Sequence, residues 1–182
     1  MRCFLCIEIN DSEIISKIVQ FQEEFNSINA KIKFVETENL HFTLKFLGEI
    51  DPSLVNDIYS IMKKIPFSPF SMALESVGTF PPGRPRVVWV GISEGRDELS
   101  SITSFLDHNL RSLGFKSEKR DFTPHLTVGR VKFIGDRKSF MDILQKRKDF
   151  QFGRMNITSI QLKKSILSSK GPTYTTLEQI QV

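Results

Sequence analysis

The spacing of apolar residues changes repeatedly along this chain, from the period of two expected of strands to the period near 3.6 expected of helices. Strands are predicted at residues 2–9, 31–36, 40–47, 70–77, 86–92, 120–128, 154–166 and 173–182. Helices are predicted over about residues 10–25, 51–61, 99–113 and 136–148, the first opening on a capping box of Asn10 and Glu13. Many consecutive strands are joined by short links. This favours an α+β fold with antiparallel or mixed sheets over a doubly wound parallel sheet.

The segment LHFTLKFL alternates between apolar and polar side chains. Its buried face is predicted to carry Leu40, Phe42, Leu44 and Phe46. The opposite face would then carry His41, Thr43 and Lys45. A histidine followed two residues later by a threonine occurs again as His125 and Thr127, 84 residues further on, as an internal duplication would place it. On a strand, this spacing sets the two Cβ atoms about 6.5–7 Å apart, so both side chains can reach one small anion.

The third histidine, His108, shows the structural alternative to a catalytic role. A histidine near a core is more often a satisfied structural residue than a catalyst. His108 lies two residues from Leu106 and from Leu110 on a predicted helix, about 200° round the helix from each. We expect it to face solvent, and we assign it no role.

Two imidazoles and two hydroxyls, without a carboxylate pair or a glycine-rich phosphate loop, are suited to in-line displacement at phosphorus. One imidazole must take a proton from the nucleophile while the other delivers a proton to the leaving group on the opposite side. A pKa near 6.5 lets one ring be neutral and its partner charged at neutral pH. Thr43 and Thr127 can donate hydroxyl hydrogens to the non-bridging phosphate oxygens.

Zinc is the main alternative use of two histidines. A catalytic zinc site needs three protein ligands, and no third ligand lies at a ligand-like spacing, although a distant carboxylate could fold in. We therefore predict no metal and no cofactor. A second alternative is a non-catalytic protein that binds an RNA end or a nucleotide and uses the histidines as ligands for phosphate.

The charge balance of 25 Lys and Arg against 21 Asp and Glu favours anionic ligands without forming a polybasic tail. Cys3 and Cys6 point to opposite faces of a strand, so they do not form a disulfide framework. The apolar start of the chain is broken by Glu8, and no stretch approaches the roughly 20 apolar residues of a membrane span. We expect a cytoplasmic protein with no membrane partner.

The two motifs and their flanks resemble a known family, the two-histidine phosphoesterases. Within it, they are similar to the RNA 2′,3′-cyclic phosphodiesterases, also described as 2′-5′ RNA ligases. The similar segments are MRCFLCIEI, LHFTLKFLGE, GTFPPGRPRVVWVGI, FTPHLTVGRV and LKKSILSSKGPTYTTLE. The resemblance implies a bilobed α+β fold in which two antiparallel sheets flank a central cleft, with helices on the outer faces and a pseudo-two-fold duplication. We expect one two-lobed domain over residues 1–182, acting as a monomer.

The same resemblance implies hydrolysis of a 2′,3′-cyclic phosphate, at an RNA end or in a small nucleotide, to a 2′-phosphomonoester without a metal. His41 matches the proton donor to the leaving 3′ oxygen, and His125 matches the proton acceptor that activates water. Thr43 and Thr127 match the donors to phosphate oxygens. The residues themselves do not decide which histidine is the acid. Ligation of a cyclic-phosphate end to a 5′-hydroxyl end uses the same displacement and stays open as an alternative.

Five further residues are candidates for binding substrate: Arg130, Lys45, Arg84, Arg86 and Phe80. On a regular strand Arg130 would point away from His125, and a bulge at Gly129 would turn it back. Arg84, Arg86 and Lys45 could contact phosphates, or they could be solvated basic side chains. Phe80, in the loop of residues 78–86, could stack on a base or pack within the protein.

Overall fold

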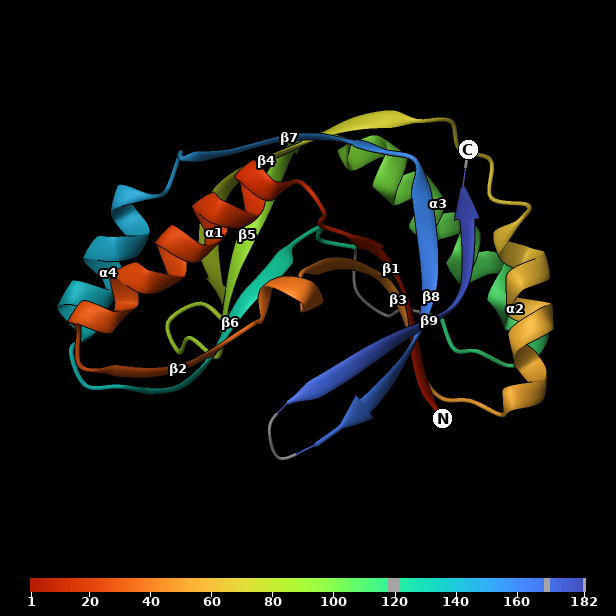
Figure 1. Cartoon of the computed structure of the whole chain (residues 1–182), viewed down its shortest axis with the longest axis horizontal. Coiled ribbons are helices and arrows are strands. Elements are labelled where there is room, and N and C mark those ends of the chain that lie inside the picture. Colours follow the sequence, from red (N-terminus) through yellow and green to blue (C-terminus); the bar gives the residue numbers. More distant parts are fainter. Residues whose placement is uncertain (118–121, 169–170, 182) are drawn as a thin grey trace.

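The computed structural model describes residues 1–117, 122–168 and 171–181 and has the α+β architecture expected from the sequence (Figure 1). The strands are β1 (Arg2–Glu8), β2 (Ala30–Phe34), β3 (His41–Glu49), β4 (Phe70–Phe80), β5 (Val87–Glu94), β6 (Leu126–Ile134), β7 (Gln151–Ile157), β8 (Ser159–Leu167) and β9 (Pro172–Gln181). The α-helices are α1 (Ser12–Glu24), α2 (Val55–Met62), α3 (Arg96–Asn109) and α4 (Arg137–Lys146). Short 3₁₀ turns are η1 (Phe25–Ser27), η2 (Thr37–Asn39), η3 (Pro52–Leu54) and η4 (Leu110–Leu113).

The strands form one curled antiparallel sheet with two halves. Its order is β7-β4-β5-β6-β3-β1-β8-β9, and β2 pairs with β6 beside this path. The first lobe contains β7, β4, β5, β6 and β2, and the second contains β3, β1, β8 and β9 (Figure 1). The lobes meet where β3 pairs with β6 through one residue pair, Phe42 opposite Leu126. The predicted antiparallel α+β fold is confirmed, but the two sheets expected to flank a cleft are two halves of one sheet, joined by this pair.

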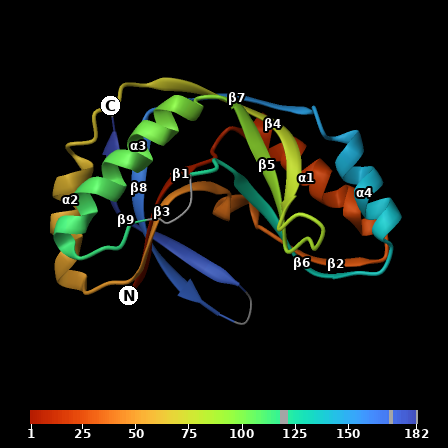
Figure 2. The same cartoon turned by 180° about the vertical axis from the view of Figure 1, so that it is seen from behind.

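The helices cover the outer side of the curl. In the first lobe α1 packs on β7 and β6, and in the second α3 packs on β3 while α2 packs on β9. Figure 2 shows the same arrangement from behind, with α1 and α4 over one lobe and α2 and α3 over the other. Apolar side chains fill the space between the helices and the sheet, among them Phe21, Phe140 and Leu106, all with no exposed surface. The inner face of the sheet is therefore left for ligands.

Two local predictions were wrong. Residues 154–166 do not form one strand, because β7 ends at Ile157 in the first lobe and β8 begins at Ser159 in the second. The N-cap of α1 is Asp11 and not Asn10, because the Asp11 carboxylate accepts the backbone N–H groups of Glu13 and Ile14. The predicted strand 120–128 is described only from residue 122, and its assigned strand begins at Leu126.

Among the described residues, every helix is too short or too polar to cross a lipid bilayer. Cys3 and Cys6 are buried free thiols, as their spacing predicted. His108 is exposed on α3, which confirms the expectation that it faces solvent.

Candidate active site

The junction between the lobes brings the two His-x-Thr motifs together. An antiparallel strand pair has a local two-fold axis, and here that axis passes between Phe42 and Leu126, each of which directly follows a motif histidine. Both of these residues are buried, with 1% and 0% of their surface exposed, so their neighbours in sequence point to the inner face. The register sets His41 across from Thr127 and Thr43 across from His125. Diagonal neighbours in such a pair lie about 7–8 Å apart, which is the relation of His41 to His125.

Each histidine ring is fixed by a hydrogen bond to the backbone two residues earlier. Nδ1 of His41 lies 2.6 Å from the carbonyl oxygen of Asn39, and Nδ1 of His125 lies 2.7 Å from the carbonyl oxygen of Thr123. Because a carbonyl oxygen only accepts, Nδ1 carries the proton in both rings. Nε2 is therefore the atom that each ring presents to a ligand, as a base when the ring is neutral and as an acid when it is charged.

Aromatic side chains pack against both imidazoles. The ring of His41 lies 4.9 Å from that of Phe4 and 5.3 Å, edge to face, from that of Tyr174. The ring of His125 lies 5.1 Å from that of Phe80, also edge to face. Phe80 in turn packs against Trp89 at 5.2 Å. Phe80 therefore positions His125 through packing, and base stacking by Phe80 stays a prediction.

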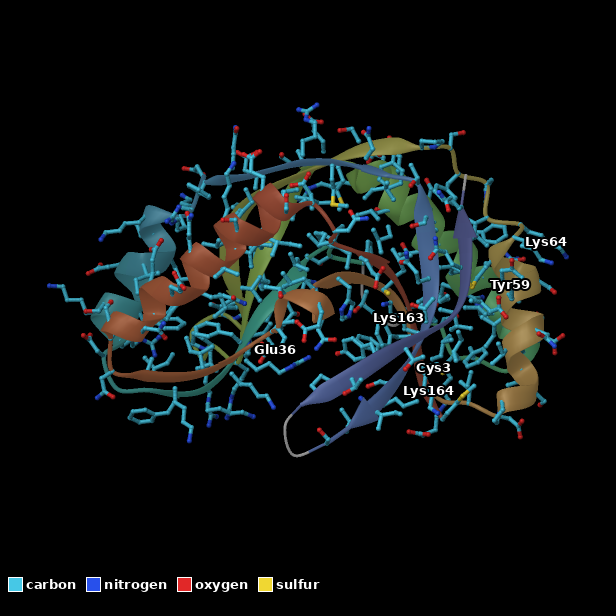
Figure 3. The ribbon with its side chains drawn as sticks, viewed as in Figure 1. Cys3, Glu36, Tyr59, Lys64, Lys163 and Lys164 are labelled. Carbon is cyan, nitrogen blue, oxygen red and sulfur yellow. The ribbon has the colours of Figure 1, made fainter. Side chains whose placement is uncertain are left out.

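The surroundings of His41 favour its neutral form. Burial lowers the pKa of His41 below its ordinary value, although the hydrogen bond to Asn39 acts in the opposite direction. Three charges act more weakly: Lys163 and Arg130 lower the pKa of His41, and Glu8 raises it. Lys163, labelled on β8 in Figure 3, is buried. It forms an ion pair with Glu8, which lies opposite His41 in the sheet register. Burial thus favours the neutral form of His41 before any anion binds.

A β-bulge follows each histidine at the same distance. On β3, Thr43 pairs with Cys6 and Lys45 pairs with Leu5, which leaves Leu44 as the extra residue. On β6, Thr127 pairs with Trp89 and Gly129 pairs with Val88, which leaves Val128 as the extra residue. The extra residue is the third after the histidine in both motifs. Because a bulge reverses the side-chain alternation, the fifth residue after each histidine returns to the inner face.

Those fifth residues are Phe46 and Arg130. Phe46 was predicted to be buried, but it is 61% exposed, and its ring lies 6.3 Å from that of Phe4, which also contacts His41. The strict alternation of apolar and polar residues did not indicate this exposed position. Arg130 is exposed and lowers the pKa of His41. The extra residue that returns Arg130 to the inner face is Val128, one position before Gly129, where a bulge was considered.

The prediction that Lys45 lies on the His41 face was wrong. Lys45 follows the bulged residue, is only 3% exposed, and points to the side of the sheet that α3 covers. Its Nζ lies 2.6 Å from Oδ1 of Asp107 on α3 and 2.9 Å from the carbonyl oxygen of Lys116. Lys45 therefore holds α3 to β3 and does not face a ligand at the histidines.

The loop that carries Arg84 and Arg86 is anchored beside the far part of β6. Regular structure in β4 extends to Phe80, so the loop comprises residues 81–86. The carbonyl oxygen of Arg86 accepts the backbone N–H of Val131 at 2.9 Å, which fixes the loop beside the far part of β6. Val131 lies three pairing steps beyond Thr127, about 10 Å along a strand, because Val128 is an extra residue. The loop anchor is therefore separated from Thr127 along β6, and direct contact of the two arginines with a phosphate at the histidines stays a prediction.

Comparison with known proteins identifies the family of the whole chain. Residues 2–182 match the family model described as the AKAP7 2′5′ RNA ligase-like domain. The chain is 41% identical over 180 residues to the RNA 2′,3′-cyclic phosphodiesterase of Methanocaldococcus jannaschii, covering 98% of this chain and 99% of that protein. It is also 41% identical over 177 residues to the protein of that name from Archaeoglobus fulgidus, covering 96% of each.

Solved structures share the fold over the whole chain. Escherichia coli LigT in complex with 3′-AMP has a TM-score of 0.81 at 23% identity, covering 100% of this chain and 97% of that one. The protein TT0787 of Thermus thermophilus has a TM-score of 0.79 at 25% identity, with the same coverage. The fold and the paired motifs define the class of two-histidine phosphoesterases. The chain belongs to the 2′5′ RNA ligase-like family of that class.

Proposed function

We propose that this protein hydrolyses the 2′,3′-cyclic phosphodiester at an RNA 3′ end, or in a small nucleotide, to a 2′-phosphomonoester. The observation that carries the proposal is the local two-fold axis at Phe42 and Leu126, which places two equivalent His-x-Thr units on one face. The relatives named RNA 2′,3′-cyclic phosphodiesterase, with 41% identity over nearly the whole chain, support the choice of substrate.

In the proposed reaction Nε2 of His125 takes a proton from a water molecule, and the water oxygen attacks phosphorus. The bond from phosphorus to O3′ breaks on the opposite side, and Nε2–H of His41 gives its proton to O3′. The products are a 2′-phosphate and a 3′-hydroxyl. Thr43 and Thr127 donate hydroxyl hydrogens to the non-bridging oxygens, where negative charge grows in the transition state. The Arg130 guanidinium adds positive charge on the same face.

The role of His41 as acid requires a proton that burial disfavours in the unliganded protein. The phosphodiester anion supplies the missing charge, because a negative group beside an imidazole raises its pKa. The reverse assignment, with neutral His41 as the base, is the second candidate and is favoured by that same burial.

A substrate with sulfur in place of O3′ distinguishes the two assignments, because a thiolate leaves without needing a proton. If His41 is the acid, His41→Ala loses far less activity on the sulfur analogue than on the natural substrate, whereas His125→Ala loses as much on both. The opposite pattern would reverse the roles. Equal losses for both variants on both substrates would exclude general acid catalysis by either ring.

The function itself is tested by ³¹P NMR of a 2′,3′-cyclic nucleotide incubated with the protein and EDTA. We expect the cyclic signal to be replaced by that of a 2′-monoester, and persistence of the cyclic signal would refute the proposal. An oligonucleotide with a 5′-hydroxyl end in the same tube tests the alternative, since a 2′-5′ linked product would show ligation.

We further propose that residues 1–182 act as one domain and as a monomer in the cytoplasm. Both halves of the acid–base pair come from one chain, so no second copy is needed to complete the site. Sedimentation velocity at increasing protein concentration tests the monomer, which predicts an unchanged sedimentation coefficient for a particle of 20.9 kDa.

A further inference from the structure

A second, basic site lies at the far part of β6. A surface pocket of about 250 Å³ there is lined by Arg84, Arg86, Lys132, Phe133 and Arg137 among others. The loop of residues 81–86 is held in place on two sides. The Arg86 carbonyl accepts the Val131 N–H, and Nη2 of Arg137, at the start of α4, donates to the carbonyl oxygen of Gly83 at 2.9 Å. The pocket is thus built from three anchored segments.

The pocket concentrates positive charge. Its four cationic side chains, Arg84, Arg86, Lys132 and Arg137, are all exposed. Within the part of the chain that the structure describes, none of the four forms an ion pair with a carboxylate. The neighbouring acid, Asp136, is engaged as the N-cap of α4, where its side chain accepts the N–H of Ser139. The site is therefore suited to an anion with several charges.

An exposed aromatic ring connects this pocket to the face that carries the catalytic residues. Phe133 is 56% exposed and lies opposite Lys31 in the sheet register, while Arg130 lies opposite Lys33. Residues opposite each other share a face, and Lys31 and Lys33 are two apart on β2, so Arg130 and Phe133 point to the same side. That side also carries Thr127. A continuous strip thus runs along β6 from the reacting centre to the basic pocket.

We propose that this strip and pocket bind the single-stranded RNA on the 5′ side of the terminal cyclic phosphate. The pocket cations would contact the phosphates of the chain, and Phe133 would stack on a base. The inference rests on the proposed function for the identity of the polymer. Arginine clusters that meet phosphates, with an aromatic ring that stacks on a base, are the features by which proteins hold single strands.

The length of the strip defines what it can bind. Thr127 and Phe133 are four pairing steps apart in the register with β5 and β2, about 13 Å along a strand, because Val128 and Lys132 are extra residues. A mononucleotide held between His41 and His125 does not span this distance, whereas an RNA chain of several nucleotides does. The basic pocket therefore selects oligonucleotides over mononucleotides and leaves the chemistry at the histidines unchanged.

The test compares kcat/KM on two substrates. One is a cyclic mononucleotide, and the other is an oligoribonucleotide that ends in a 2′,3′-cyclic phosphate. The oligoribonucleotide has about ten nucleotides, a length within the range of known single-strand binding sites. The variant is Arg84→Gln with Lys132→Gln, which leaves the Arg137 tether intact. The matched control is Lys63→Gln with Lys64→Gln, which removes the same charge from the end of α2 in the second lobe. Figure 3 labels Lys64 there. A separate Phe133→Ala variant tests stacking.

We expect the pocket variant to lose at least about tenfold in kcat/KM on the oligonucleotide and to stay within about twofold on the mononucleotide. The dependence of log kcat/KM on log salt should flatten by about 1.4, for two lost phosphate contacts on a single strand. Phe133→Ala should lose about 5- to 150-fold on the oligonucleotide alone. Unchanged oligonucleotide kinetics, or equal losses on both substrates or in the control, would overturn the proposal.

Binding is measured separately, by fluorescence anisotropy of an oligoribonucleotide that already carries the 2′-phosphate product. This binding measurement needs no turnover, so it tests the RNA-binding role of the pocket independently of the proposed reaction. If the wild-type protein binds this oligonucleotide with no higher affinity than a 2′-mononucleotide, the pocket does not bind RNA. If it binds well and the pocket variant does not, the inference holds whatever the reaction.

Discussion

Replacing Lys45 by methionine tests whether Lys45 stabilises the fold or binds the substrate. The Lys45 ammonium is only 3% exposed, and it forms an ion pair at 2.6 Å with Asp107 and a hydrogen bond at 2.9 Å with the carbonyl oxygen of Lys116. Methionine keeps most of the aliphatic volume and removes the buried charge together with its desolvation penalty. We therefore expect folding to tolerate Lys45→Met and activity to be preserved.

The size of the effect follows from which partner is removed. Removing one partner of a buried pair costs about 3–5 kcal/mol when the other charge stays behind, and Asp107 is 21% exposed, so we take about 3 kcal/mol for Asp107→Ala. For a chain of this size that lowers Tm by about 6–12 °C. Lys45→Met leaves Asp107 beside Arg111, at 3.4 Å, and should cost about 1 kcal/mol, or about 2–4 °C.

The assay is thermal unfolding of both single variants and the double variant, together with kcat/KM on a cyclic nucleotide. We expect Lys45→Met to keep kcat/KM within about twofold of wild type. The double variant should be more stable than Asp107→Ala alone, because the buried ammonium that has lost the Asp107 carboxylate is removed with it. A hundredfold loss of kcat/KM in Lys45→Met at an almost unchanged Tm would refute the structural role and indicate that Lys45 binds the substrate.

Three more outcomes are expected. In Gly129→Ala the new Cβ would lie 2.8 Å from Cγ2 of Ile32, so β2 must shift; we expect a loss of about 1–3 kcal/mol in urea unfolding and a higher KM as Arg130 moves. Because burial lowers the pKa of His41, the ring signal of His41 in an NMR titration should have its midpoint below about 6.5 and move up when a 2′-nucleotide is added. Below about pH 6.5 the His41 ring binds its proton more readily in the unfolded chain than in the folded one, so the free energy of unfolding should decrease on acidification. It should decrease more in the wild type than in His41→Gln, and an equal pH dependence would contradict the burial argument. Phe46→Ala should leave Tm within about 2 °C, because the ring is 61% exposed, and should raise KM by about 5- to 150-fold if the ring stacks on the base, with Phe46→Trp restoring it.

The alternation of side chains in LHFTLKFL was sufficient to predict the inner face up to Thr43. It failed from Lys45 onward because Leu44 is an extra residue in the pairing with β1, a strand about 40 residues earlier in the sequence. A bulge depends on that partner strand, so the local pattern does not contain it. The same bulge explains why Lys45 is buried and Phe46 is exposed, each the opposite of the face predicted for it.

The passage of the chain from the first lobe to the second at Thr158 could not be predicted from the sequence, for a related reason. Residues 151–157 and 159–167 both have strand character, and nothing in their composition marks that one pairs with β4 and the other with β1. At the start of α1 two adjacent residues, Asn10 and Asp11, are both good caps, and only the backbone decides between them. Repetition of His-x-Thr, in contrast, was visible in the sequence, and it identified the strands that meet at the two-fold axis.

The central claim is that His41 and His125 act on one phosphate in one step. It is tested most directly by kcat on a cyclic nucleotide for His41→Ala, His125→Ala and the double variant, all verified to be folded. Each single change should cost about 10²–10⁴-fold, and the double change should cost little more than either single one, because neither proton transfer proceeds without the other. A double variant whose loss equals the product of the two single losses would show that the histidines act independently and would contradict the account.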